Sequence, residues 1–190
     1  MESLLQAIRS LIRLSPAEAD LVRELFVPQQ LAAGEYFLQE GKVCRDIAFV
    51  EKGLLRYFVN NDGIEQTFYF SKENEFACSY PSFLPQAPST RNIQALEDTQ
   101  LYVVSYDNMQ RFYREVREGE RFGRLAIEQV FVGASIQMDS LYIDTPEQRY
   151  LQFLSSFPSL VQRLPQYYIA SYVGVKPQSL SRIRKRLSAH

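Results

Sequence analysis

Seven basic side chains and no acidic one follow Glu147, the last acidic residue of the 190-residue chain. They are Arg149, Arg163, Lys176, Arg182, Arg184, Lys185 and Arg186. Guanidinium and ammonium groups bind phosphates, and a guanidinium also matches two acceptor atoms of guanine. Of 21 basic and 22 acidic residues, removing these seven leaves 14 basic against 22 acidic in residues 1–147, a net charge of −8. The total charge of −1 therefore conceals a basic C-terminal part suited to a polyanion.

Residues 166–185 have the residue types that would hold these charges on a helix-turn-helix. That motif needs a small residue where its two helices meet, here Ala170, and four positions later a residue with positive φ, here Gly174. Pro177 can open the second helix, because its missing N–H is one that a first helical turn leaves unpaired. The predicted core between the two helices consists of Ile169, Val173, Val175, Leu180 and Ile183.

With that core buried, the second helix would direct its polar side chains outward. Arg182 and Gln178 are predicted to read base edges, because guanidinium fits guanine O6 and N7 and a carboxamide fits adenine N6 and N7. The other predicted DNA-binding residues, all but Ser181 as phosphate contacts, are Lys176, Ser179, Ser181, Arg184, Lys185 and Arg186. The predicted partner is double-stranded DNA. A three-helix protein-binding module with an incidental basic face is the alternative.

Residues 3–26 are predicted to be helical, with a new helix after Ser15. Pro16 at a first helical position and Glu18 three residues after Ser15 complete a capping-box pattern. This region would flank the elements that follow.

From residue 27 to about 104, apolar residues alternate with a period of two, and turn signals such as Asp62-Gly63 separate the runs. The predicted strands are Tyr36–Leu38, Ile47–Val50, Leu54–Val59, Thr67–Phe70 and Leu101–Val104. Many short strands without intervening helices predict an antiparallel sandwich or barrel. Three prolines between residues 79 and 92 prevent a regular central strand there, so this stretch is the expected lip of a pocket.

Residues 107 to about 142 are predicted to form one long helix with a heptad-like apolar seam. The seam residues are Ile127, Phe131, Ala134, Met138 and Leu141. We predict that a second copy of the chain covers this seam; packing on the chain's own sandwich is the alternative. A further helix is expected after Thr145-Pro146, so the predicted domains are residues 1–142 and 143–190.

Composition excludes several classes of function. Two cysteines, Cys44 and Cys78, are too few for a disulfide framework, a four-thiolate zinc site or a cysteine-ligated iron–sulfur cluster. The only histidine is His190, which removes the usual general base and most metal-ligand sets. We therefore expect no enzyme, no metal site and no cofactor. No apolar run approaches 18 residues and the first residues lack a cleavable signal pattern, so a cytoplasmic protein without membrane spans is expected.

Essentially the whole chain resembles the Crp/Fnr family of bacterial transcription regulators. Residues 34–41 and 47–56 are similar to the glycine-punctuated sandwich signature of that family, and residues 180–185 are similar to its recognition helix. The resemblance implies an α+β fold: an antiparallel β jelly roll of the cyclic-nucleotide-binding type with flanking helices, a long dimerisation helix and a small all-α helix-turn-helix domain at the C-terminus. It implies a DNA-binding homodimer, and it admits a small-molecule effector of unknown identity and RNA polymerase as further partners.

The effector pocket departs from the pattern of the family's cyclic nucleotide binders. Where those members have an Arg-Ser or Arg-Thr pair for the phosphate, this chain has Ser89-Thr90, and where they have Gly-Glu it has Ala77-Cys78. Losing the guanidinium would cost about 1.5–3 kcal/mol for one charged hydrogen bond, so cyclic AMP is predicted not to be the effector. The residues expected to line any pocket are Phe76, Ala77, Cys78, Ser79, Ser89, Thr90 and Arg91.

Two further interpretations belong to other functional classes. One is a ligand-binding or enzymatic jelly roll of the cupin type, although cupin metal sites use histidines that this chain lacks in its sandwich region. The other is a protein-interaction module with a non-functional DNA reader. The sequence does not name the operator, the regulated genes or the direction of regulation.

Overall fold

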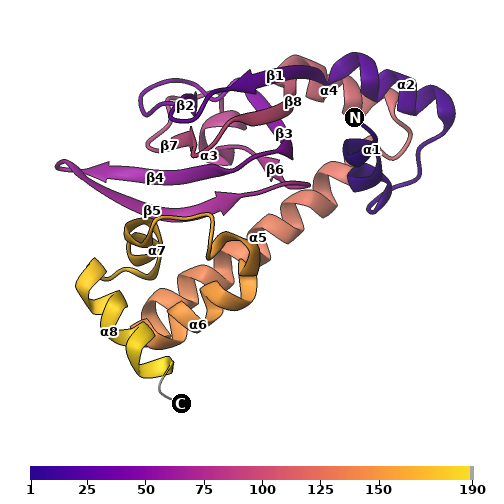
Figure 1. Ribbon diagram of the computed structural model, residues 1–190. Coiled ribbons are helices and arrows are strands. Elements are labelled where there is room, and N and C mark those ends of the chain that lie inside the picture. Colours follow the sequence, from indigo (N-terminus) through magenta and orange to yellow (C-terminus); the bar gives the residue numbers. More distant parts are fainter. Residues whose placement is uncertain (189–190) are drawn as a thin grey trace. The chain divides into compact units, whose positions relative to one another are not determined.

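The computed structural model describes residues 1–188 and comprises two compact units. The sandwich unit contains residues 1–59 and 69–129, and the helical unit contains residues 60–68 and, of the described residues, 130–188. The strands are β1 (Val27–Leu31), β2 (Tyr36–Leu38), β3 (Asp46–Lys52), β4 (Leu55–Asn61), β5 (Ile64–Ser71), β6 (Phe76–Ala77), β7 (Asn92–Ala95) and β8 (Thr99–Ser105). The helices are α1 (Glu2–Arg9), α2 (Pro16–Leu25), α3 (Tyr80–Phe83), α4 (Tyr106–Glu115), α5 (Gly119–Ile143), α6 (Pro146–Ser156), α7 (Gln166–Val173) and α8 (Pro177–Leu187), with a 3₁₀ turn at Pro158–Leu160 (Figure 1).

The strands form two four-stranded sheets, in the orders β1-β8-β3-β6 and β2-β7-β4-β5 (Figure 1). The pairing is antiparallel, as between Ala48 and its partners Val103 on β8 and Ala77 on β6. Four consecutive residues of β3, 47–50, are buried, so this strand is covered on both faces. Leu4, Leu5 and Ile8 of α1 are fully buried, and α1 contacts β3. The predicted antiparallel jelly roll with flanking helices is confirmed.

Three strands were not predicted from the sequence. β1 contains Pro28, which a central strand would not accept, and it is accommodated because β1 lies at a sheet edge. β6 has only two residues, too few to show alternation. β7 lies between β2 and β4, but it directly follows the proline-rich stretch that hides its start.

The single helix predicted over residues 107–142 is wrong in one respect, because it is divided at residues 116–118. α4 ends where Val116 turns to extended backbone and becomes buried, and α5 begins at Gly119. A Cβ atom at Gly119 would lie 2.4 Å from the backbone oxygen of Phe112 in the last turns of α4. The close approach of the two helices therefore requires a residue without a side chain at this position.

Capping and aromatic packing organise the helical unit. α6 begins with a capping box between Thr145 and Gln148, at the predicted restart. The rings of Phe153, Phe157 and Tyr172 pack together, with centroids 5.3–5.8 Å apart. None of the helices within residues 1–188 combines the length and apolar character needed to cross a bilayer. The predicted domain boundary at 142/143 falls inside the helical unit and stays a prediction.

The contact at Gly119 gives a prediction about stability. Gly119→Ala should lower the free energy of unfolding by about 1–3 kcal/mol, because the new methyl group meets backbone rather than a flexible side chain. Urea denaturation followed by circular dichroism measures the change.

Gly133→Ala, in the same helix, is the matched control. Nothing lies within 4 Å of the methyl position there, so this change should stabilise the helix by about 0.5–1 kcal/mol. Equal effects of the two substitutions would contradict the packing described for the α4–α5 junction.

Candidate functional site

The helix-turn-helix predicted over residues 166–185 is formed by α7 and α8. Gly174 ends α7 in the left-handed region, with φ 77° and ψ 35°, as its position in the motif predicted. Ala170 is fully buried, and Leu180 and Ile183 are buried where α8 contacts α7. The predicted core is confirmed, with Val175 only half-buried. Burial of one side of α8 determines which residues face solvent.

All eight predicted DNA-binding residues are exposed on α8 or directly before it. Gln178, Ser181, Arg182 and Lys185 follow the i, i+3, i+4, i+7 spacing of one helix face. Lys176 precedes the helix in extended backbone, and its side chain makes no capping hydrogen bond to α8. Backbone N–H groups at such a helix start suit an anion, and α8 contains no acidic residue.

Two of these residues already have partners within the helical unit. Arg186 forms an ion pair with Glu147 of α6, and Ser181 donates its hydroxyl hydrogen to the carbonyl of Pro177 at 3.2 Å. A phosphate contact by Arg186 would have to compete with Glu147. Its predicted role, like the others on α8, stays a prediction.

The predicted dimer seam lies exposed along α5. Ile127, Phe131, Met138 and Leu141 are 37%, 71%, 57% and 59% exposed, and Ala134 is also exposed. The sequence pattern underestimated the width of this apolar surface. Further exposed apolar residues of α5 are Val130, Val132, Ile136, Tyr142 and Ile143.

The predicted effector-pocket residues come from two segments that meet at a pair of serines. β6 and the two residues before α3 supply residues 76–79, and the segment before β7 supplies residues 89–91. The Ser79 and Ser89 hydroxyl oxygens lie 3.4 Å apart, and both residues are buried. Ser89 also accepts from the Arg91 N–H at 3.1 Å. Thr90 is exposed, so it is not part of this cluster.

Tyr57 of β4 is a polar member of this site that was not among the predicted pocket residues. Its phenol oxygen accepts from the Cys78 backbone N–H at 3.2 Å and lies 3.2 Å from the Ser71 hydroxyl. Burial raises the pKa of Tyr57 well above its usual value, so the phenol stays neutral. A buried tyrosine hydroxyl needs hydrogen-bond partners, so a tyrosine within a predicted strand was the sequence signal for this polar cluster. The Tyr57 side chain therefore occupies the N–H of Cys78.

The two cysteines lie together beside this cluster. A hydrogen bond with the Cys78 thiol lowers the pKa of the Cys44 thiol, whereas burial raises the pKa of Cys78 well above its usual value. Cys44 itself donates to the carbonyl of Asp46 at 3.3 Å, and its backbone N–H donates to Ser82 at 2.8 Å. These contacts tie the segment before β3 to α3.

Arg91 provides the only guanidinium among the predicted pocket residues. It is half-buried, and burial lowers its pKa. Phe76 instead lines a separate apolar recess, formed with Phe26 directly after α2 and with residues of β3, α3, α4 and α5. That recess holds about 20 Å³, enough for about one water molecule. Within residues 1–188 there is no group of three histidine, cysteine or carboxylate side chains placed to hold a metal ion.

Residues 28–116 match the family model of the cyclic nucleotide-binding domain. Solved structures with the same architecture include a putative Crp/Fnr-family transcriptional regulator from Eubacterium rectale, at 17% identity and a TM-score of 0.71, covering 93% of this chain and 84% of that one. The chain has the Crp/Fnr fold. The resemblance drawn from the sequence is confirmed at that level.

Two further structures bear this out. FixK2 from Bradyrhizobium japonicum has 16% identity and a TM-score of 0.73, covering 86% of this chain and 85% of that one. The catabolite activator protein of Thermus thermophilus has 18% identity and a TM-score of 0.59, covering 93% and 84%. No curated protein matches the sequence. The Crp/Fnr fold thus extends over sandwich, long helix and helix-turn-helix alike.

The Tyr57 contacts give a prediction about stability. Tyr57→Phe removes the acceptor for the buried Cys78 N–H and should lower the free energy of unfolding by about 1–3 kcal/mol. Tyr36→Phe, at a position 37% exposed, is the control and should change it by less than about 0.5 kcal/mol. Chemical denaturation of both variants provides the measurement. A Tyr57→Phe protein as stable as the wild type would show that the phenol is not the partner of that N–H.

Proposed function

We propose that this chain is a transcriptional regulator that binds double-stranded DNA as a homodimer through α8. The observation that carries the proposal is the exposed, acid-free polar face of a helix whose opposite side is buried on α7. The second helix of a helix-turn-helix enters the major groove, and here that helix is α8. Arg182 and Gln178 are its residues whose chemistry matches base edges. The role is regulatory rather than enzymatic and belongs in the cytoplasm.

The apolar surface of α5 supports the homodimer. Phe131, for example, is 71% exposed. Single exposed apolar residues are common on protein surfaces, but a continuous apolar stripe along a helix is uncommon. The heptad-like spacing of the seam suits a parallel second copy of the same helix. Two copies of α8 would then meet half-sites about one DNA turn, ~34 Å, apart.

The pocket residues support an effector other than cyclic AMP. The Tyr57 hydroxyl engages the Cys78 N–H, and Ser89 stands where an arginine would pair with a cyclic phosphate. Binding that phosphate here would displace neutral hydrogen bonds, and Arg91 is not at the position of that arginine. A signal that acts on the sandwich would regulate DNA binding by shifting the population of dimer arrangements.

The dimer proposal predicts the effect of a charge in the seam. Phe131→Glu should convert the dimer to a monomer at micromolar concentration, because two carboxylates would be buried opposite each other. Gln129→Glu, on the same helix outside the seam, should remain dimeric. Light scattering coupled to size-exclusion chromatography gives the masses. A wild-type monomer at high concentration, or a dimeric Phe131→Glu protein, would refute the seam.

The DNA-reading proposal predicts a difference between two arginines of α8. Arg182→Ala should weaken binding to a preferred duplex by about 1–3 kcal/mol while changing binding to a scrambled duplex far less. Arg184→Ala, assigned to a phosphate, should weaken both duplexes alike. Fluorescence anisotropy at matched salt separates the two patterns. If Arg182→Ala left affinity and preference unchanged, α8 would not be the reading helix.

A further inference from the structure

A recess of about 320 Å³ lies where the segment after α1 meets the junction of α4 and α5. Its lining residues are Arg9, Ser10, Leu11, Ile12, Arg13, Arg117, Glu118 and Arg121. None of them falls within residues 28–116, which match the cyclic nucleotide-binding domain. Four of the 14 basic residues of the acidic part of the chain therefore converge on one place outside the sandwich pocket.

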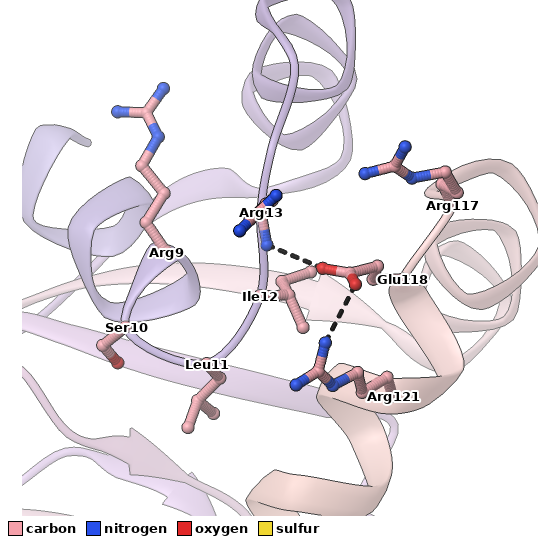
Figure 2. A pocket seen from close by; sticks show the side chains of 8 residues that line it. All are labelled: Arg9, Ser10, Leu11, Ile12, Arg13, Arg117, Glu118 and Arg121. Carbon is pink, nitrogen blue, oxygen red and sulfur yellow. Dashed lines mark hydrogen bonds and ion pairs between the residues drawn. The ribbon is translucent and has the colours of Figure 1, made fainter.

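The recess contains only one carboxylate, and that carboxylate is already engaged. Glu118 accepts the Arg13 backbone N–H at 2.8 Å and a guanidinium N–H of Arg121 at 2.9 Å. Figure 2 shows the side chains of Arg13, Arg117 and Arg121 arrayed around it. The Arg13 N–H bond is the main cause of a lowered pKa of Glu118, so this carboxyl is ionised.

Within the described part of the chain, three of the four guanidinium groups of the recess are not hydrogen-bonded, although the charge of Arg117 contributes to the lowered pKa values of Glu18 and Glu118. Among residues 1–188, the side chains of Arg9, Arg13 and Arg117 make no hydrogen bond or ion pair. A further acid, Glu18, accepts the Arg117 backbone N–H at 2.8 Å while capping α2. The four arginines carry four positive charges, and Glu118 and Glu18 carry two negative ones. The site therefore has an excess of two positive charges. Like charges held together in this way favour a bound anion.

Arginines nearby on the same unit show the contrasting arrangement. Arg23 pairs with Glu2 and Asp20, Arg111 pairs with Glu24 and Glu115, and Arg124 pairs with Glu128. These pairs neutralise positive charge elsewhere in the sandwich unit. An extended polyanion such as a duplex would meet acidic side chains on α1 and α2, whereas a small anion would fit within the recess.

The backbone of the recess is held in place before any ligand arrives. Ile12 is buried, its N–H donates to the carbonyl of Ile8, and the Arg13 N–H is fixed on Glu118. The recess volume lies at the lower end of the range for small-molecule sites. Guanidinium groups bind phosphate oxygens in pairs, with charge assistance.

We propose that this recess binds a small, multiply charged phosphate, of the size of a nucleotide polyphosphate group. Arg13 and Arg117 supply the principal contacts from two segments more than 100 residues apart, and Arg9 and Arg121 flank them. A bound phosphate would join the segment after α1 to the start of α5. The assignment goes beyond DNA binding and does not depend on it.

Isothermal titration of the full chain with sodium tripolyphosphate tests the site. The wild type should bind, and the Arg13→Gln/Arg117→Gln double variant should bind at least about tenfold more weakly. Both side chains are exposed, so the variant should fold, which circular dichroism and thermal melting check. Tripolyphosphate should raise the melting temperature of the wild type and not that of the double variant.

Two double variants control for charge alone. Arg23→Gln/Arg111→Gln removes the same charge from the same unit outside the recess, and Arg184→Gln/Lys185→Gln removes it from α8. Both should retain wild-type affinity for tripolyphosphate. Absence of binding to the wild type, equal binding by the Arg13→Gln/Arg117→Gln variant, or loss of binding in the α8 variant would overturn the proposal. ATP as a second probe distinguishes a nucleotide from a bare polyphosphate as the source of the same group.

Discussion

Burial of Leu180 and Ile183 against α7 decides which side of α8 meets solvent, and the proposed chemistry of the C-terminal part depends on that choice. The packing needs the small side chain of Ala170 and the left-handed turn at Gly174. A rotation of α8 by about half a turn would bury Gln178 and Arg182 and expose Leu180 and Ile183. The helix-turn-helix therefore links a packing requirement directly to a pattern of donors that can face a nucleic acid.

Positive charge with little neighbouring acid is common to the two proposed binding sites. In the sandwich unit, arginines such as Arg23 and Arg111 are neutralised by neighbouring carboxylates, whereas α8 and the recess at Arg13 and Arg117 present positive charge with little acid nearby. Each concentration of charge is costly without a counter-ion and favours an anionic partner. The two sites differ in form, because α8 presents a convex helix face and the recess is concave.

The sequence predicted those features whose cause is local. Alternation of apolar residues located β2, β3, β4, β5 and β8, and the positions of Ala170, Gly174 and Pro177 located the helix-turn-helix. The features that it missed depend on contacts between distant segments. Gly119 is required by the backbone of α4, Tyr57 finds its N–H partner 21 residues away, and Arg13 meets Glu118 across 105 residues. No local pattern reports such contacts, so the break after α4, the filling of the pocket and the arginine recess emerged only from the fold.

The most direct test of the central claim is selection of DNA sites from a random duplex pool by the purified full chain. We expect enrichment of an inverted repeat whose half-sites are centred about 10 base pairs apart, with binding that weakens steeply as salt increases. That result would join α8 as the reader to α5 as the dimer seam in one observation. A pool that remains random after repeated rounds at low salt would contradict the account.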